Sequence, residues 1–247
     1  MTAMAISVDA DIASMSCRAA QRLAALAGEA CAARGAFHLV LSGGTTPRSL
    51  YQTLSAPEFR STIDWARVHV YFGDERAVPP EHPDSNYGMA KAALLDHVPI
   101  PPAQIHRIDV AFASVRQDAA HYAKTLASNA PHDAQGVPQF DLILLGMGPD
   151  GHTASLFPGY PAVEETERWV IEVPKAHVEP FVPRVTLTLP ALGSCREMLI
   201  EASGAGKRPI LTRVFAGEDL PANRVHSAGE TIWLVDAAAL PENFRER

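Results

Sequence analysis

The sequence predicts an α/β fold in which buried β-strands alternate with helices. Apolar runs with the length and branching of buried strands recur along the chain, for example at residues 36–41 and 140–145. Glycine-rich turns follow these runs, and at residues 42–54 such a turn leads into a helical pattern. Because parallel neighbours in a sheet need a crossover connection, this order is typical of a mostly parallel sheet covered by helices.

Length and composition favour one domain that spans residues 1–247. A chain of this size buries a single α/β core, and no linker-like stretch divides it. Apolar residues make up 47% and charged residues 20%, which is ordinary for a soluble protein. No run approaches the roughly 18 apolar residues of a transmembrane helix, and no signal peptide is visible. We therefore expect a cytoplasmic protein that does not bind a membrane.

The net charge and the cysteines narrow the range of partners. The formal net charge of −7 disfavours nucleic acid, which generally requires a broad basic surface. It is compatible with a small phosphorylated ligand, because such a ligand needs only a few cations and backbone N–H groups. The three cysteines, Cys17, Cys31 and Cys195, are widely spaced, so neither a disulfide framework nor a thiolate zinc site is expected.

The first predicted element is a long packing helix. It is alanine-rich, has Asp9 or Asp11 as a possible N-cap, and runs to Arg34. Apolar residues recur within it at roughly helical spacing, and Gly35 ends it. We expect this helix to be scaffold only.

A candidate anion site follows the first predicted strand. Gly43 and Gly44 free the backbone at this point. Thr45 or Thr46 can cap a helix whose first position suits Pro47. Exposed N–H groups and the dipole at a helix N-terminus both favour a phosphate. The loop matches neither the Walker nor the dinucleotide-binding pattern, so no nucleotide is implied, and a plain tight turn is the alternative.

A charged cluster follows the second predicted strand. Residues 67–72 alternate like a strand, and Asp74, Glu75 and Arg76 come shortly after it. Open α/β sheets bind ligands at the carboxyl ends of their strands, so this cluster is a candidate site. A solvated loop is the alternative. Three further elements are expected before the centre of the chain, namely a helix at 86–96, a possible strand at 104–108 and a helix at 112–128.

The central stretch, residues 140–159, carries the strongest chemical signal. After its apolar run, three glycines crowd into residues 146–151, so the backbone must turn tightly or admit a ligand closely. Asp150 and His152 lie in and next to this turn, and residues 153–157 suggest one short helical turn. A titratable pair is thus expected at a strand end that faces a cleft. The alternative is a turn aspartate and a structural histidine.

The C-terminal half predicts further strands, two of which adjoin a basic residue. These strands lie at residues 167–173, 184–189, 197–202 and 231–236. Arg184 stands at the start of the second of them. After the third, a small-residue loop places Lys207 at the N-terminus of a helix predicted at 209–215. The helix dipole disfavours a cation there unless an anion is shared.

Taken together, these segments resemble the 6-phosphogluconolactonase family of the pentose phosphate pathway. The resemblance spans nearly the whole chain through SGGTTP at 42–47, YFGDERAVPPEHPDSNYG at 71–88, GMGPDGHTASLFPG at 146–159, PRVTLTLP at 183–190 and GAGKRPIL at 204–211. It implies a Rossmann-like, mostly parallel sheet with helices on both faces, similar to glucosamine-6-phosphate deaminases and ribose-5-phosphate isomerases.

Two positions favour the lactonases over the related deaminases. The deaminases carry Glu-Pro-Gly after their Asp-Gly-His loop, with the glutamate assisting ring opening, whereas this chain has Phe157 at that position. Deaminases typically have tyrosine where Arg76 follows Asp74 and Glu75. The resemblance therefore implies a carboxylic ester hydrolase that opens 6-phospho-D-glucono-1,5-lactone without a cofactor or a metal.

For such a hydrolase, His152 is the expected general base that activates water, because the unperturbed pKa of histidine lies near neutrality. Asp150 or Asp74 is expected to orient its imidazole. Arg76 or backbone N–H groups of the glycine loops are expected to receive the developing oxyanion. Ser155 is not in a GxSxG elbow, so it is expected to be structural or to contact the substrate.

The phosphate of the substrate is expected to meet cations and a helix N-terminus. The candidates are Lys207, Arg184 and the loop that contains Ser42, Gly43, Gly44 and Thr45, with Arg48 and Arg208 as weaker ones.

Three other interpretations remain open from the sequence alone. One is a metal hydrolase that uses His152, Asp150 and His177. The second is a phosphosugar-binding sensor without catalysis, and the third is a deaminase-like isomerase. The small phosphorylated lactone is the expected partner, and the chain is expected to be a monomer or a weak homo-oligomer.

Overall fold

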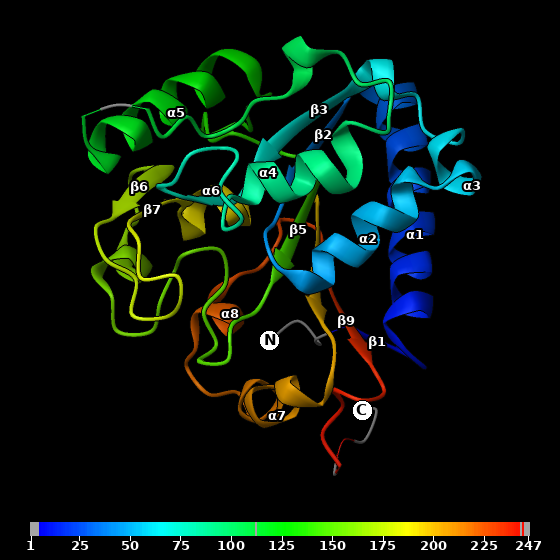
Figure 1. Cartoon of the computed structure of the whole chain (residues 1–247), viewed down its shortest axis with the longest axis vertical. Coiled ribbons are helices and arrows are strands. Elements are labelled where there is room, and N and C mark those ends of the chain that lie inside the picture. The colour runs from blue at the N-terminus through cyan, green and yellow to red at the C-terminus, as the bar shows by residue number, and fades with distance from the viewer. Residues whose placement is uncertain (1–4, 112, 243, 245–247) are drawn as a thin grey trace.

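The centre of the molecule is a six-stranded parallel sheet (Figure 1). The computed structural model describes residues 5–111, 113–242 and 244. In spatial order the strands are β1 (Ala5–Asp9), β9 (Glu230–Asp236), β8 (Glu197–Ala202), β5 (Leu142–Gly146), β2 (Phe37–Leu41) and β3 (Val68–Phe72). All five neighbouring pairs are parallel, as the alternation of strands and helices predicts.

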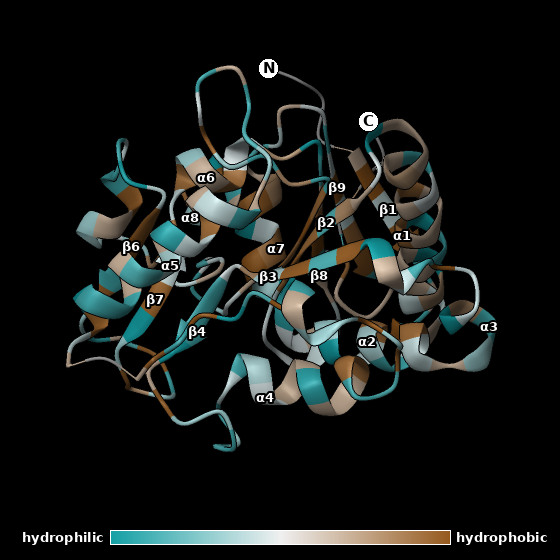
Figure 2. Cartoon of the chain, turned by 90° about the horizontal axis from the view of Figure 1, so that it is seen from above, coloured by the Kyte–Doolittle hydropathy of each residue, from teal (hydrophilic) through white to brown (hydrophobic). Residues whose placement is uncertain are grey.

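Helices cover both faces of this sheet. Figure 1 shows α1 (Ile12–Arg34) and α2 (Thr45–Ser55) on one side and α5 (Val115–Asn129) on the other. The shorter helices are α3 (Pro57–Arg60), α4 (Asn86–Ala90) with a π-helical turn at Lys91–Leu95, α6 (Leu189–Gly193), α7 (Arg208–Phe215) and α8 (Pro221–Arg224). Figure 2 shows that hydrophobic residues concentrate in the strands between these helices.

The strands at the middle of the sheet form the core. Residues Leu142 to Leu145 are all fully buried, because β5 lies between β2 and β8 with helices on both faces. This explains why the sequence there is a continuous apolar run rather than an alternating one. The carboxyl ends of β2, β3, β5 and β8 lie at the same edge of the sheet.

The first helix forms as its sequence predicts. Asp11 is its N-cap and accepts a hydrogen bond from the Ser14 amide at 2.8 Å, while Gly35 ends it with a φ of 85°. Asp9, the other candidate, ends β1 and pairs with Arg18 at 2.9 Å. Strand β1 is an element that the sequence analysis does not predict.

A second, three-stranded antiparallel sheet adjoins the first. It contains β4 (Asp74–Arg76), β7 (Arg184–Leu187) and β6 (Val170–Val173), in that order. Gly73 links β3 to β4, and its carbonyl accepts from the Leu187 amide at 2.8 Å. The alternative of a solvated loop for the Asp74 cluster is therefore wrong. We keep the prediction that the two sheets belong to one domain.

Four local predictions require correction or lie outside the description. The N-cap of α2 is Gly44 rather than a threonine, and no side chain caps this helix. Residues 104–108 form no strand: a 3₁₀ turn at Pro102–Gln104 is followed by a single bridge between Val70 and Ile105. The helix predicted at 86–96 forms, but only Asn86–Ala90 is α-helical (α4), and Lys91–Leu95 continues it as a π-helical turn. Phe112, where the next helix was expected to begin, lies outside the described residues, and α5 begins at Val115.

Two further observations concern the composition. None of the three cysteines is in a disulfide, and only Cys195 is fully buried, with Cys17 and Cys31 half-buried. Among the described residues, no helix combines the length and apolar character that spanning a membrane requires.

A cluster of three histidines lies on β2, β3 and the segment after the 3₁₀ turn. The rings of His38 and His69 stack at 4.9 Å, and His69 Nδ1 lies 3.1 Å from His106 Nε2. Tyr71 stacks on His106 at 4.7 Å. Burial, with smaller contributions from its histidine neighbours, lowers the pKa of His38 to about 4. Burial and the charge of His69 lower the pKa of His106 to about 4 as well.

This cluster predicts a loss of stability in mild acid. The unfolded chain binds more protons than the folded protein between about pH 6.5 and about pH 4, so the free energy of unfolding falls as pH is lowered through that window. Because His38 is only partly buried, we expect it to contribute only about 1 kcal/mol. Denaturant unfolding of His38→Gln between pH 4 and pH 7 should show a shallower dependence on pH than the unsubstituted protein. His226→Gln, at an exposed histidine outside the cluster, should not, and equal slopes for His38→Gln and the unsubstituted protein would contradict the prediction.

Candidate active site

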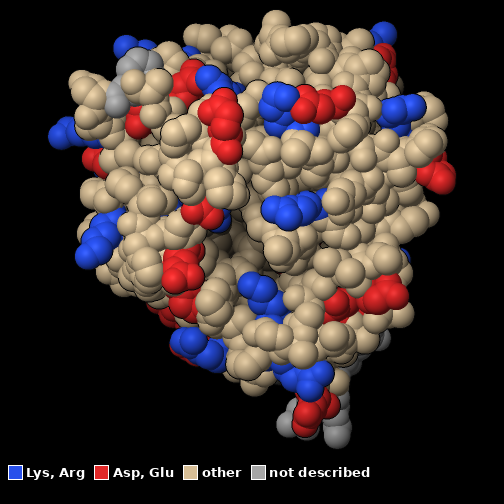
Figure 3. Space-filling view, in the orientation of Figure 1, with Lys and Arg blue, Asp and Glu red and all other residues tan. Residues whose placement is uncertain are grey.

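A pocket of about 170 Å³ lies at the carboxyl edge of the parallel sheet. Figure 3 shows it as a hollow bordered by basic and acidic side chains. All the principal predicted site residues except Asp150 line it, namely Ser42, Gly43, Gly44, Thr45, Asp74, Arg76, His152, Arg184 and Lys207. Five separate segments of the chain meet there, as the strand-end argument predicts.

The imidazole of His152 is held by the carboxylate of Asp150. Its Nδ1 lies 2.5 Å from Asp150 Oδ1, and its amide donates to the same oxygen at 3.1 Å. Burial by itself would raise the pKa of Asp150, but the hydrogen bonds and charge of His152 outweigh burial and hold that pKa well below its usual range. Asp150 therefore stays a carboxylate that accepts from Nδ1, which leaves Nε2 of His152 as the acceptor.

Asp150 also contacts a second histidine. Its Oδ2 lies 2.9 Å from Nε2 of His177, whose side chain is 39% exposed. The rings of Phe157 and Tyr160 pack against His177 at 5.0 and 5.3 Å. The carboxylate thus joins the pocket histidine to a histidine at the molecular surface.

The turn around His152 needs glycine at two positions. A Cβ atom on Gly148 would lie 2.0 Å from Cε1 of His152, because the imidazole packs directly over that backbone. Gly151 has a φ of 87°, a conformation that favours glycine. Phe157 is fully buried and packs against the imidazole, with ring centroids 4.7 Å apart.

The helical turn predicted at residues 153–157 does not form. Instead Thr153 and Leu156 make an isolated antiparallel bridge, and Ala154 has a φ of 48°. The hydroxyl of Thr153 donates to the Gly146 carbonyl at 2.9 Å, which ties the segment back to the end of β5. The tertiary contact outweighs the local helical preference of this short stretch.

Asp74 has different partners from Asp150. Its Oδ2 accepts from the Ser155 hydroxyl at 2.6 Å, and its Oδ1 accepts from the side-chain amide (Nδ2) of Asn86 at 3.1 Å. Asp74 is 4% exposed and lines the pocket. The acid in contact with the His152 imidazole is therefore Asp150. Ser155 is fully buried and supports Asp74, so of the two roles expected for it the structure gives the structural one.

Glu75 points away from the pocket. Its carboxylate accepts from the amides of Asn86 and Tyr87 at 2.8 Å each, at the N-terminus of α4. Burial raises the pKa of Glu75, and these backbone hydrogen bonds oppose that rise. The glutamate therefore fixes the 81–88 segment, whereas its neighbours Asp74 and Arg76 face the site.

Two arginines face each other across the small sheet. Arg76 and Arg184 are register partners on β4 and β7, and both line the pocket. Arg76 donates to the Asp84 carbonyl at 2.7 Å and Arg184 to the Pro180 carbonyl at 2.9 Å. The buried Nε of each has no hydrogen-bond partner among the described residues. Burial lowers the pKa of Arg184, and Asp74 partly offsets this.

On the other side of the pocket, the loop before α2 is shaped for an anion. Ser42 is fixed at both its amide and its carbonyl by the Tyr51 hydroxyl, at 2.8 and 2.7 Å. Gly44 has a φ of 110°, and a Cβ on Gly43 would lie 1.9 Å from Oδ1 of Asn86. With no side chain capping α2, its first amides are available to a ligand.

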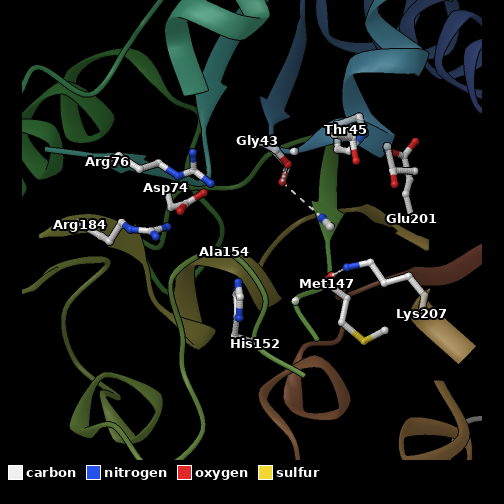
Figure 4. Close-up of a pocket in the computed structure, with 16 residues that line it drawn as sticks. Gly43, Thr45, Asp74, Arg76, Met147, His152, Ala154, Arg184, Glu201 and Lys207 are labelled. Carbon is white, nitrogen blue, oxygen red and sulfur yellow. Dashed lines mark hydrogen bonds between the residues drawn. The ribbon is translucent and has the colours of Figure 1, made fainter. Parts of the chain in front are cut away.

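Lys207 lies on the same side of the pocket as Thr45 (Figure 4). Its ammonium donates to the Met147 carbonyl, and burial lowers its pKa while the charge of Asp150 opposes that. The two weaker phosphate candidates lie elsewhere. Arg208 donates to the Ala238 carbonyl at 3.0 Å, and Arg48 lines a different cavity between α2 and α4.

Of the lining residues that were not predicted as site residues, Glu201 near the end of β8 is the one that can ionise. It is 1% exposed, and neither carboxylate oxygen has a hydrogen-bond partner among the described residues. Burial raises its pKa to about 8. A glutamate after the apolar run Met198–Ile200, two residues before a small-residue loop, was the available signal. Within residues 5–111, 113–242 and 244, no three histidine, cysteine, aspartate or glutamate side chains gather as a metal-binding group.

Comparison with known proteins assigns the family. A family model described as glucosamine-6-phosphate isomerases/6-phosphogluconolactonase matches residues 10–233. The chain belongs to this family. It is 43% identical over 221 residues to the 6-phosphogluconolactonase of Synechocystis sp.. These aligned residues make up 88% of each of the two chains.

Solved structures agree with this assignment to the 6-phosphogluconolactonase family. The 6-phosphogluconolactonase from Trypanosoma cruzi superposes with a TM-score of 0.85 at 29% identity, over 96% of each chain. A monomeric glucosamine-6-phosphate deaminase superposes with a TM-score of 0.80 at 18% identity, over 96% of this chain and 98% of that one. The second likeness shows the shared fold alone, and it confirms the predicted Rossmann-like architecture.

The close packing of Gly148 gives a structural prediction. In Gly148→Ala the new methyl group displaces the His152 imidazole, because the clash is with a side chain that can move. NMR of the ring N–H protons should then lose the resonance of the His152 Nδ1–H that bonds Asp150, in a protein that remains folded. Gly28→Ala is the control, since no atom lies within 4 Å of a Cβ there. Retention of the resonance in Gly148→Ala would show that the ring does not depend on the glycine.

Proposed function

We propose that this protein hydrolyses 6-phospho-D-glucono-1,5-lactone to 6-phospho-D-gluconate in the oxidative pentose phosphate pathway. The observation that carries the proposal is the Asp150–His152 pair, 2.5 Å apart, at the wall of a pocket that also contains an anion-binding loop. The relatives with this name and the match to the family model support it. The substrate is the small phosphorylated lactone.

In this proposal His152 is the general base. A water molecule between Nε2 and the lactone carbonyl loses a proton to the imidazole as its oxygen bonds to carbon C1. The imidazolium then returns the proton to the ring oxygen as the bond between C1 and that oxygen breaks. Asp150 stays ionised, fixes the tautomer through Nδ1 and stabilises the imidazolium.

The oxyanion and the phosphate are assigned to opposite sides of the pocket. Figure 4 shows Asp74, Arg76 and Arg184 on one side, the Gly43–Thr45 loop and Lys207 on the other, and His152 between them. We assign the developing oxyanion to Arg76 and Arg184, whose Nε atoms have no partner among the described residues. The phosphate is assigned to the loop, the first amides of α2 and Lys207.

The deaminase alternative is disfavoured by Phe157. The position of the ring-opening glutamate in deaminases is here a fully buried aromatic ring that packs on His152. No carboxylate is therefore available at that point. The sensor alternative is disfavoured by the His152–Asp150 geometry, which simple binding of a phosphosugar does not require.

Replacement of His152 tests the base directly. In His152→Gln we expect the hydrolysis rate of freshly prepared lactone, followed by proton release, to fall by about 10²- to 10⁴-fold. His177→Gln should lose less than about tenfold, because His177 acts only through Asp150. The activity of the unsubstituted protein should survive a chelator. If that protein does not exceed spontaneous hydrolysis, the lactonase proposal fails, and ammonia release from glucosamine 6-phosphate and phosphosugar binding would be tested next.

Replacement of Lys207 tests the phosphate site. Loss of one charge-assisted hydrogen bond should raise KM for the lactone by about 10- to 100-fold in Lys207→Met, with a smaller effect on kcat. Arg208→Met is the matched control, because the neighbouring guanidinium bonds the Ala238 carbonyl outside the pocket. Equal KM values for the two variants would remove Lys207 from the phosphate site.

A further inference from the structure

Glu201 is a buried acid that the proposed mechanism does not use. It lies near the C-terminal end of β8, at the pocket, and its register partners are Gly146 on β5 and Leu234 on β9. Neither partner offers a charge or a side-chain hydrogen bond. Both carboxyl oxygens lack a partner among the described residues, although the side chain is 1% exposed and lines the pocket. A buried polar group of this kind is costly unless something binds it.

The surroundings of Glu201 point to the phosphate side of the pocket. Figure 4 shows it beside Thr45, on the side where Lys207 also lies. Burial, with a smaller contribution from the nearby Glu201 carboxyl group, raises the pKa of Tyr51, the residue whose hydroxyl bonds both the amide and the carbonyl of Ser42. The acid therefore lies beside the loop to which the phosphate is assigned and lines the same pocket.

We propose that Glu201 is a specificity-determining residue that, as a neutral carboxylic acid, donates a hydrogen bond to a phosphate oxygen of the substrate. This inference rests on the proposed function, since it assumes that a phosphate occupies the loop. A phosphate dianion accepts hydrogen bonds only, so the protonated acid is a matching donor and the carboxylate would repel it. The same group favours phosphorylated sugar acids over unphosphorylated ones of the same shape.

The neutral form is the stable one in this environment near neutral pH. Burial raises the pKa of Glu201 to about 8, and no described side chain hydrogen-bonds its carboxyl group. The groups that face it on its own side of the pocket include Tyr51 from α2 and Lys207 from the 3₁₀ turn at Ala205–Lys207. The Lys207 ammonium donates to the Met147 carbonyl. The carboxylate of Asp236 on β9 accepts hydrogen bonds from the hydroxyl of Ser203 and the amide of Gly204. Across the pocket lie His152, Asp74, Arg76 and Arg184.

The test uses binding of the stable product, so that spontaneous lactone hydrolysis does not interfere. Calorimetric titration with 6-phosphogluconate, and with unphosphorylated gluconate, is carried out between pH 7 and pH 9. In the unsubstituted protein the affinity for 6-phosphogluconate should fall by about tenfold over this range as Glu201 ionises. Glu201→Gln, which remains a neutral donor, should keep its affinity at pH 7 within about twofold and lose most of this fall.

Two further variants make the outcome decisive. Glu201→Leu should weaken the binding of 6-phosphogluconate by about five- to tenfold at pH 7 and leave the affinity for gluconate unchanged, because only the phosphate loses a hydrogen-bond donor. Glu197→Gln, on the same strand but paired with Arg22, should behave as the unsubstituted protein does. If the affinity of Glu201→Gln for 6-phosphogluconate still falls by the full amount between pH 7 and pH 9, the group that titrates is Lys207 and the proposal is wrong. It is equally wrong if Glu201→Leu binds 6-phosphogluconate normally.

Lactone hydrolysis by the unsubstituted protein is measured in parallel. If hydrolysis is absent while the pH-dependent binding of 6-phosphogluconate depends on Glu201, the proposed function fails and this inference stands. If hydrolysis is present and the Glu201 variants bind as the unsubstituted protein does, the inference fails alone.

Discussion

The site depends on the packing of one imidazole ring over a bare stretch of backbone. His152 lies where a Cβ on Gly148 would be, with Asp150 on its Nδ1 and the Phe157 ring against its face. Three contacts of different kinds, steric, electrostatic and aromatic, leave the ring a single orientation. That orientation directs Nε2 into the pocket, where we propose that it takes a proton from water and returns it to the leaving oxygen.

The parallel sheet brings the partners of this ring together. The ends of β2, β5 and β8 supply the anion loop, the histidine turn and Glu201, and short connections add Lys207 and the small sheet with Arg76 and Arg184. Rigid strands place these groups more precisely than long loops would. The small sheet matters for the same reason, because its antiparallel register sets two guanidinium groups opposite each other.

Several buried groups in the pocket lack partners in a way that a substrate would correct. The Nε atoms of Arg76 and Arg184 await acceptors, and the carboxyl group of Glu201 can donate once it is neutral. By contrast Glu75, next to two pocket residues in the sequence, is satisfied by the backbone of the α4 N-terminus. Glu75 and Glu201 are thus both buried acids close to the site, but only Glu201 lines the pocket and lacks a hydrogen-bond partner among the described residues.

The sequence alone determined the alternation of strands and helices, the anion loop, and the Asp-Gly-His turn, because apolar periodicity and glycine clusters are local signals. It predicted nine residues that line the pocket, namely Ser42, Gly43, Gly44, Thr45, Asp74, Arg76, His152, Arg184 and Lys207. Only the tertiary structure decided that Asp150 rather than Asp74 contacts His152, that residues 153–157 bridge rather than coil, and that Glu201 faces the pocket. Segments distant in the chain decide these points: Ser155 engages Asp74, the Ser155 amide donates to Thr186, and the parallel sheet brings Glu201 to the pocket. Local sequence carries no signal for such contacts.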